Sequence, residues 1–113
     1  MAFVLKQSET YTWPVTVEWP VDGGKTASAK FDAEFKRLSQ SRIDELAAAA
    51  QSGSMTDGDI IRQLICGWAG VTDDDGDVPY SEKALAALLD ITGVQKGILS
   101  SWFDSQAGAK RKN

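Results

Sequence analysis

The stretch TYTWPVTVEWPVDGGKTASAKFDAEFK, residues 10–36, decides the fold of the first third of this chain. Its apolar residues alternate with polar ones on both sides of a glycine pair. A period of two is typical of β-strands that bury one face. The apolar positions are all odd-numbered: Tyr11, Trp13, Val15, Val17 and Trp19 in the first run, and Ala27, Ala29, Phe31, Ala33 and Phe35 in the second. The stretch therefore predicts two half-buried strands joined as a hairpin.

The turn between the two strands sets their register. A two-residue Gly23-Gly24 turn would place odd residues opposite even ones and expose one apolar set to solvent. A three-residue loop over 22–24, with Gly24 left-handed, keeps both apolar sets on one face. Pro14 lacks an N–H, so we expect a sheet edge on the outer side of the first strand. Large side chains face small ones at several of the predicted pairs, which are Trp19–Ala27, Val17–Ala29, Val15–Phe31 and Trp13–Ala33.

Helical patterns dominate the remaining chain. Four helices are expected, over RIDELAAAAQ (42–51), GDIIRQLICGW (58–68), EKALAALLD (82–90) and GVQKGILSSWFDSQAG (93–108). Side chains that can cap a helix precede each of them: Ser41 with Asp44, Thr56 with Asp59, Ser81, and Thr92. The segment AFVLK (2–6) is a candidate for a third, short strand.

These patterns predict one α+β domain over residues 1–113, a length that suits a single modest core. An N-terminal antiparallel β-hairpin sheet of two to three strands occupies 1–37. About four short α-helices follow in 38–108, and a flexible basic tail occupies 109–113. Trp13, Trp19 and Trp68 are expected in the core.

The acidic stretch GVTDDDGDVPYSE, residues 70–82, resembles an EF-hand calcium loop. With Gly76 at position 6 of that pattern, Asp73, Asp75 and Glu82 fall at positions 3, 5 and 12. Position 1 is then Val71, which offers no side-chain oxygen. Turn chemistry alone explains the aspartates and the glycine, so we expect a tight exposed turn or small hairpin and no metal site.

Composition excludes several classes of function. Histidine is absent, which removes the commonest general base and the commonest transition-metal ligand. The single cysteine, Cys66, lies in an apolar run and is expected to be a buried structural thiol in a reducing compartment. The net charge of −4 argues against nucleic acid as the main partner. Without a long apolar run or a signal-like N-terminus, neither a membrane span nor a signal peptide is expected. We expect no enzymatic activity and no cofactor.

The order of these segments resembles a known family, the small tail assembly chaperones of long-tailed bacteriophages and prophages. The likeness covers nearly the whole chain. It is carried by FVLKQSETYTWPVTVEWPVDGGK (3–25), FDAEFKRLSQSRIDEL (31–46), IIRQLICGWAGVTDDDGDVPYSEKALAALLD (60–90) and GAKRKN (108–113). The family has no catalytic motif, so the resemblance rests on the ordered set of segments.

The resemblance implies a non-enzymatic chaperone in the cytoplasm of a bacterial host. Such proteins bind the long, helical tape-measure protein, keep it soluble while tail-tube subunits polymerise around it, and are absent from the mature virion. The tail-tube protein is a second candidate partner, and self-association is left open. The resemblance also implies that a longer, frameshifted form exists in many relatives.

One stripe on the last helix is the candidate partner-binding site. Ile98, Leu99, Trp102 and Phe103 lie at helical spacing and are expected to project from one side of that helix.

Alternatives from other classes stay open: a structural tail or head–tail connector component retained in the virion, and a small regulatory module that binds a host protein or nucleic acid. An enzyme is the least favoured class.

Overall fold

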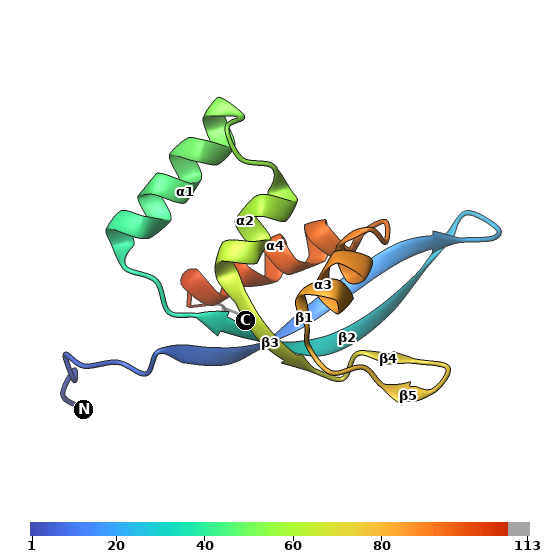
Figure 1. Cartoon of the computed structure of the whole chain (residues 1–113), viewed down its shortest axis with the longest axis horizontal. Coiled ribbons are helices and arrows are strands. Elements are labelled where there is room, and N and C mark those ends of the chain that lie inside the picture. Colours follow the sequence, from blue (N-terminus) through green and yellow to red (C-terminus); the bar gives the residue numbers. More distant parts are fainter. Residues whose placement is uncertain (109–113) are drawn as a thin grey trace.

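The computed structural model describes residues 1–108, so the basic tail predicted for 109–113 lies outside the described residues. The described part has the expected α+β architecture, with a three-stranded antiparallel sheet and four helices (Figure 1). The helices gather on one side of the sheet, over the face that carries the odd-numbered apolar residues. This arrangement leaves the opposite face of the hairpin exposed.

The hairpin has the predicted register. Strand β1 (Thr10–Val21) pairs with β2 (Lys25–Lys36), and all four predicted pairs, from Trp19–Ala27 to Trp13–Ala33, are present. Both glycines of the three-residue loop have positive φ angles, 83° at Gly23 and 73° at Gly24. The odd loop length puts both apolar sets on one face. Parity and turn chemistry together were therefore sufficient to fix this part of the fold.

The third strand does not come from AFVLK, which forms no strand. It is β3 (Ile65–Ala69), which pairs with β2 on the side opposite β1. The helix predicted over 58–68 is instead α2 (Asp57–Leu64), which ends where β3 begins. Residues 65–69 pair instead with the free edge of β2, where Gly67 lies opposite Glu34. A Cβ at Gly67 would meet the Glu34 side chain, whose carboxylate at 2.7 Å can move aside.

Two of the four predicted helix caps are correct. Thr56 and Asp59 form a reciprocal capping box on α2, and Ser81 caps α3 (Glu82–Leu89) by accepting the Ala84 N–H at 3.0 Å. Helix α1 (Gln40–Ser52) starts earlier than predicted, because Ser39 rather than Ser41 accepts the Arg42 N–H.

The N-cap of α4 (Val94–Gln106) was also predicted wrongly. Gly93 takes that position in place of Thr92, and it adopts a left-handed φ of 92° without a side-chain cap. A side chain at this position would be strained, so backbone geometry rather than side-chain capping selects the residue.

Helix α4 covers the outer edge of β1 at very short range. A Cβ at Gly97 would stand 2.5 Å from the Thr16 carbonyl oxygen, and a Cβ at Gly93 would collide with the Glu18 carbonyl oxygen. Gly93 and Gly97 are four residues apart and therefore lie on the same side of the helix. Their lack of side chains lets the helix backbone rest on the strand.

Two serines continue this row toward the end of α4. The Ser101 hydroxyl accepts the Thr16 N–H at 3.4 Å, and the Ser105 hydroxyl lies 2.8 Å from the Tyr11 hydroxyl. The Thr16 N–H points away from the sheet, so the serine supplies the acceptor that no fourth strand provides. This row, at 93, 97, 101 and 105, turns a sheet edge into a helix–strand interface.

The core lies between the inner sheet face and helices α2, α3 and α4. Its largest fully buried side chains are Phe35, Ile61, Leu64, Ile65, Leu85, Ile98 and Val15. Trp13, Trp19 and Trp68, which were expected in the core, are partly buried and pack against it. Helix α1 contributes only Leu46 to the buried set, so it is the helix least anchored to the rest of the molecule.

The acidic stretch forms the predicted small hairpin, with β4 (Thr72–Asp73) paired to β5 (Gly76–Asp77). The Asp73 carboxylate accepts the Asp75 N–H at 2.8 Å across the turn, and Gly76 has a φ of 115°. The first aspartate and the glycine are thus used by the turn itself.

Candidate functional site

An apolar groove between α1, α2 and α4, here called the helical groove, is the first candidate binding site. It has a volume of about 140 Å³. A cavity of about 150 Å³ accommodates a benzene ring, so the helical groove has room for one aromatic or aliphatic side chain. Its lining residues are Ile43, Leu46, Ala47 and Ala50 from α1, Asp57, Ile60 and Leu64 from α2, and Leu99, Trp102 and Phe103 from α4.

The four residues predicted as one partner-binding stripe divide into two rows. Ile98 and Trp102, four residues apart, are buried in the core, with 0% and 5% of their surface exposed. Leu99 and Phe103, also four residues apart, lie along the helical groove, and Phe103 is 62% exposed. Ile98 and Trp102 are therefore not exposed to a partner as the predicted stripe required, because α4 turns this side toward the core. Phe103 is the exposed aromatic of the pair.

Trp102 nevertheless contributes one wall of the groove. Its ring meets that of Phe103 edge-on, with a distance of 5.2 Å between centroids. The Trp102 Nε1–H is buried and has no acceptor within the described residues. A buried donor without an acceptor costs about 1–3 kcal/mol, so a carbonyl that reached it would stabilise the site.

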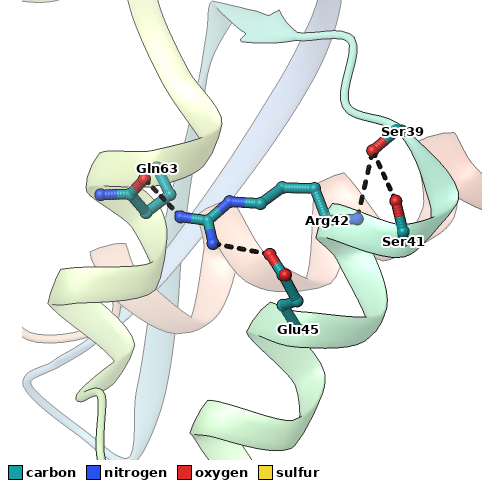
Figure 2. A network of polar contacts seen from close by, with 5 residues as sticks. All are labelled: Ser39, Ser41, Arg42, Glu45 and Gln63. Carbon is teal, nitrogen blue, oxygen red and sulfur yellow. Dashed lines mark hydrogen bonds and ion pairs between the residues drawn. The ribbon is translucent and has the colours of Figure 1, made fainter.

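Polar contacts hold the opposite wall, α1, at one end of the groove. Arg42 forms an ion pair with Glu45 at 3.0 Å and donates a second hydrogen bond to Gln63 of α2 at 3.0 Å (Figure 2). Both members of the ion pair are exposed. This exposed pair lies within α1 and contributes about 0–1 kcal/mol, so of these contacts it is the Arg42–Gln63 hydrogen bond that joins α1 to α2.

The small apolar residues on the groove face of α1 were not recognised as part of a site. Ala47 and Ala50 are exposed although they line the helical groove. Alanine is also the strongest helix former, so the alanine run was interpreted as helix propensity and not as a binding surface. The sequence signal that could have indicated a binding surface is the excess of small residues on a helix that contains a single leucine.

A second apolar groove, here called the sheet groove, lies at the far end of the hairpin. It is larger, about 610 Å³, and lies between the hairpin and the segments around α3. Val17, Trp19 and Phe31 form the hairpin side, and Val71, Leu88 and Ile91 face them. The two grooves share no lining residue.

Among residues 1–108, three ionisable groups have shifted pKa values, those of Asp59, Cys66 and Tyr80, and none of these pKa values moves closer to 7. Burial raises the pKa of the Cys66 thiol, and the negative charge of Glu34 raises it further. Burial likewise raises the pKa of the Tyr80 hydroxyl, with a further contribution from Glu82. A nucleophile or general base requires the opposite shift, so these groups are not poised for catalysis at neutral pH.

Cys66 is less buried than the sequence suggested. It is partly exposed, and its thiol lies 3.5 Å from the Glu34 carbonyl oxygen. Nearby, Trp68 donates to the Val78 carbonyl at 2.8 Å and meets the Tyr80 ring edge-on. These contacts fix the segment that follows β5, at the end of the acidic hairpin, to the sheet. We therefore assign Trp68 and Tyr80 a role in packing and not in binding.

Within residues 1–108, no group of three or more acidic, cysteine or histidine side chains is placed to hold a metal ion. Among the same residues, none of the helices has the length and apolar character needed to cross a membrane. In comparisons with known proteins, no family model, no curated protein and no solved structure matches the chain.

Proposed function

We propose that this chain is a phage tail assembly chaperone that binds the tape-measure protein in the host cytoplasm and keeps it soluble during tail-tube assembly. The observation that carries the proposal is the helical groove, an apolar recess with an exposed aromatic, Phe103, at its rim. The ordered sequence likeness to tail assembly chaperones supports it independently.

The chemistry of the groove suits a helical partner. An amphipathic helix binds such a groove by inserting apolar side chains at helical spacing. The volume of about 140 Å³ allows one apolar side chain at a time, which gives weak, reversible contact along a long partner. Reversibility is what a holdase requires, because the tape-measure protein must be released to the assembling tube.

Charge adds selectivity to this contact. Asp57 is the only charged residue among those that line the helical groove, and it lies in the first turn of α2. A lysine or arginine next to the apolar anchor of the partner would pair with it. The net charge of −4 gives the same preference for basic partner segments over nucleic acid.

Co-expression with the tape-measure protein of the same phage tests the proposal. Wild type should raise the soluble fraction of that protein. Phe103→Ser and Ala47→Glu, on opposite walls of the groove, should abolish the effect while leaving thermal melting unchanged, because both residues are exposed. Val21→Ser is the matched control, because Val21 is 43% exposed and lies outside both grooves.

Two results would contradict the proposal. If both groove variants still solubilised the tape-measure protein fully, the helical groove would not be the binding site for that protein. Mass spectrometry of purified virions should lack this chain; its presence in fixed copy number would favour a structural tail or connector component instead.

A further inference from the structure

The Trp102 side chain carries a hydrogen-bond donor that the fold of residues 1–108 does not use. Trp102 is 5% exposed, and among these residues its Nε1 is the one buried side-chain nitrogen or oxygen without a hydrogen-bond partner. Trp68, by contrast, donates its Nε1–H to the Val78 carbonyl at 2.8 Å. Buried polar groups in native proteins are nearly always paired, so an unpaired one calls for an explanation. A bound molecule with an acceptor oxygen would supply it.

The unpaired donor and the helical groove belong to one site, because Trp102 lines that groove. The groove volume of about 140 Å³ is close to that of a cavity that accommodates a benzene ring. The Trp102 and Phe103 rings already meet edge-on there, with 5.2 Å between centroids. Aromatic rings attract one another in such edge-to-face arrangements, so these walls favour a third ring as the occupant.

The polar groups of the groove narrow the choice among side chains that carry an acceptor oxygen. Serine and threonine lack a ring and leave most of the volume empty. Asparagine and glutamine would bring two N–H donors into a recess whose charged liner, Asp57, is the main acceptor on offer. The phenol of tyrosine has a ring of the right size, an oxygen that can accept from Trp102 and a single O–H that Asp57 can accept. Tyrosine is therefore the side chain that fits best.

Helix α1 is the wall that can admit this side chain. The Trp102 Nε1 is closed off from solvent, so an oxygen reaches it only when a wall of the groove moves. Helix α1 buries one residue, Leu46, and the Arg42–Gln63 hydrogen bond joins it to α2 (Figure 2). A helix with so little buried surface can move at low cost. An outward shift of α1 would widen the groove.

We propose that the helical groove binds a tyrosine side chain from a helical segment of the partner, and that α1 moves outward to admit it. The ring packs against Phe103 and Trp102, the phenol oxygen accepts the Trp102 Nε1–H, and the hydroxyl donates to Asp57. The inference rests on the proposed function, because the helix in question is that of the tape-measure protein. A carboxylate has two oxygens, so Asp57 can still pair with a basic residue beside the anchor.

The probes for this proposal are p-cresol and toluene, which share a ring and a methyl group and differ by one hydroxyl. Both are titrated into the full chain and followed by proton–nitrogen correlation NMR. p-Cresol should bind about tenfold or more tightly than toluene, because toluene leaves the donor unpaired. It should also shift the Trp102 indole signal and the backbone amide signals of Ala47 and Ala50 in α1. A recess without a usable donor would prefer toluene, because the hydroxyl would lose its hydration without compensation.

Two variants separate the donor from the recess. Trp102→Phe keeps a ring and removes the N–H, so it should lose the preference for p-cresol; it also identifies the Trp102 indole signal by its absence. Ala47→Leu fills the groove and should bind neither probe, whereas Val21→Ser, outside both grooves, should bind as wild type. Melting temperatures check that each variant is folded. The comparison of the two probes on wild type decides the matter even if Trp102→Phe does not fold.

Two results would overturn the proposal: toluene that binds as tightly as p-cresol, or a Trp102 indole signal that p-cresol does not shift. The first would indicate a leucine or phenylalanine anchor. Co-expression with the tape-measure protein is scored separately. If Phe103→Ser abolishes solubilisation while the wild-type groove prefers toluene, the tyrosine inference fails and the proposed function stands. If the groove prefers p-cresol while both groove variants of the co-expression test solubilise fully, the ligand chemistry is supported and the proposed function fails.

Discussion

Gly97 of α4 lies so close to Thr16 of β1 that a Cβ on the glycine would stand 2.5 Å from the threonine carbonyl oxygen. The atom in the way belongs to the backbone of a paired strand and cannot move aside as a flexible side chain would. The helix can therefore pack this close to the strand only because the residue at position 97 has no side chain.

Replacing this glycine with alanine should destabilise the fold. In a helix interior Gly→Ala gains about 1 kcal/mol of helix propensity. Overpacking against a fixed backbone costs about 1–3 kcal/mol, so Gly97→Ala should lower the free energy of unfolding by up to about 2 kcal/mol. Gly58→Ala is the matched control, because the atoms nearest to its Cβ all belong to side chains, with Arg62 Nη1 at 3.4 Å and Gln95 Nε2 at 3.6 Å. Urea denaturation of both variants measures the difference, and equal stability would show that α4 can shift outward.

Trp102 and Phe103 should respond oppositely to truncation. Trp102 is 5% exposed, so Trp102→Ala should lower the free energy of unfolding by about 3–5 kcal/mol. Phe103→Ala, at a residue 62% exposed, should change it by less than about 0.5 kcal/mol. Thermal and chemical melting measure both. A stable Trp102→Ala would mean that Trp102 is not the core residue that its burial indicates.

The capping box of α2 should make stability depend on pH in the acid range. The Thr56 N–H donates to the Asp59 carboxylate at 3.1 Å and lowers the pKa of Asp59 below its ordinary value of 3.8, and the Thr56 side chain lowers it further. Because the folded pKa is the lower one, the ionised cap contributes stability above the unfolded pKa. That contribution is lost as the pH falls through the folded pKa.

Asp59→Asn should therefore flatten the acid limb of the stability curve, measured as urea midpoints from about pH 7 down to about pH 2. Asp57→Asn removes a charge from the same helical turn and keeps the hydrogen bond between Thr56 and Asp59. It should retain the acid-dependent loss. If the two variants have the same pH profile, the capping box is not its source.

Calcium should not stabilise the protein. The Asp73 carboxylate already accepts the Asp75 N–H within the turn, and Val71 replaces the first ligand of the calcium pattern. A site occupied at a hundred times its dissociation constant would add about 2.7 kcal/mol, which raises the melting temperature of a domain this size by about 10 °C or more. Melting curves with EDTA and with about 1 mM calcium compare the two states. A rise of that size would restore the metal-site interpretation.

The parts of the fold that were predictable are those in which local pattern and burial agree. Alternation in β1 and β2 fixed the hairpin register, because shifting either strand by one residue would expose an apolar set. The boundary between α2 and β3 was missed because Ile60, Ile61, Leu64 and Ile65 continue one helical pattern. Strand β3 exists because β2 offers a free edge, and a distant edge leaves no local signal in the sequence.

The candidate site was predicted only in part, for a related reason. Helical spacing correctly grouped four residues of α4, but it does not say which side of a helix meets the core. The row Gly93, Gly97, Ser101 and Ser105 fixes the rotation of α4 against β1. With that rotation Trp102 turns inward and Phe103 outward. Small residues repeated every fourth position carried this information in the sequence.

The cover that α4 provides for β1 also has a consequence for synthesis on the ribosome. Thr16 and Ser101 are 85 residues apart in the chain. At about 5–20 residues per second, translation takes about 4–17 s to make the second after the first. Throughout this interval the outer edge of the nascent hairpin is uncovered, and neighbouring ribosomes on one messenger hold identical edges close together. Pro14 offers no N–H on this edge, so it interrupts pairing between nascent chains before α4 has been translated.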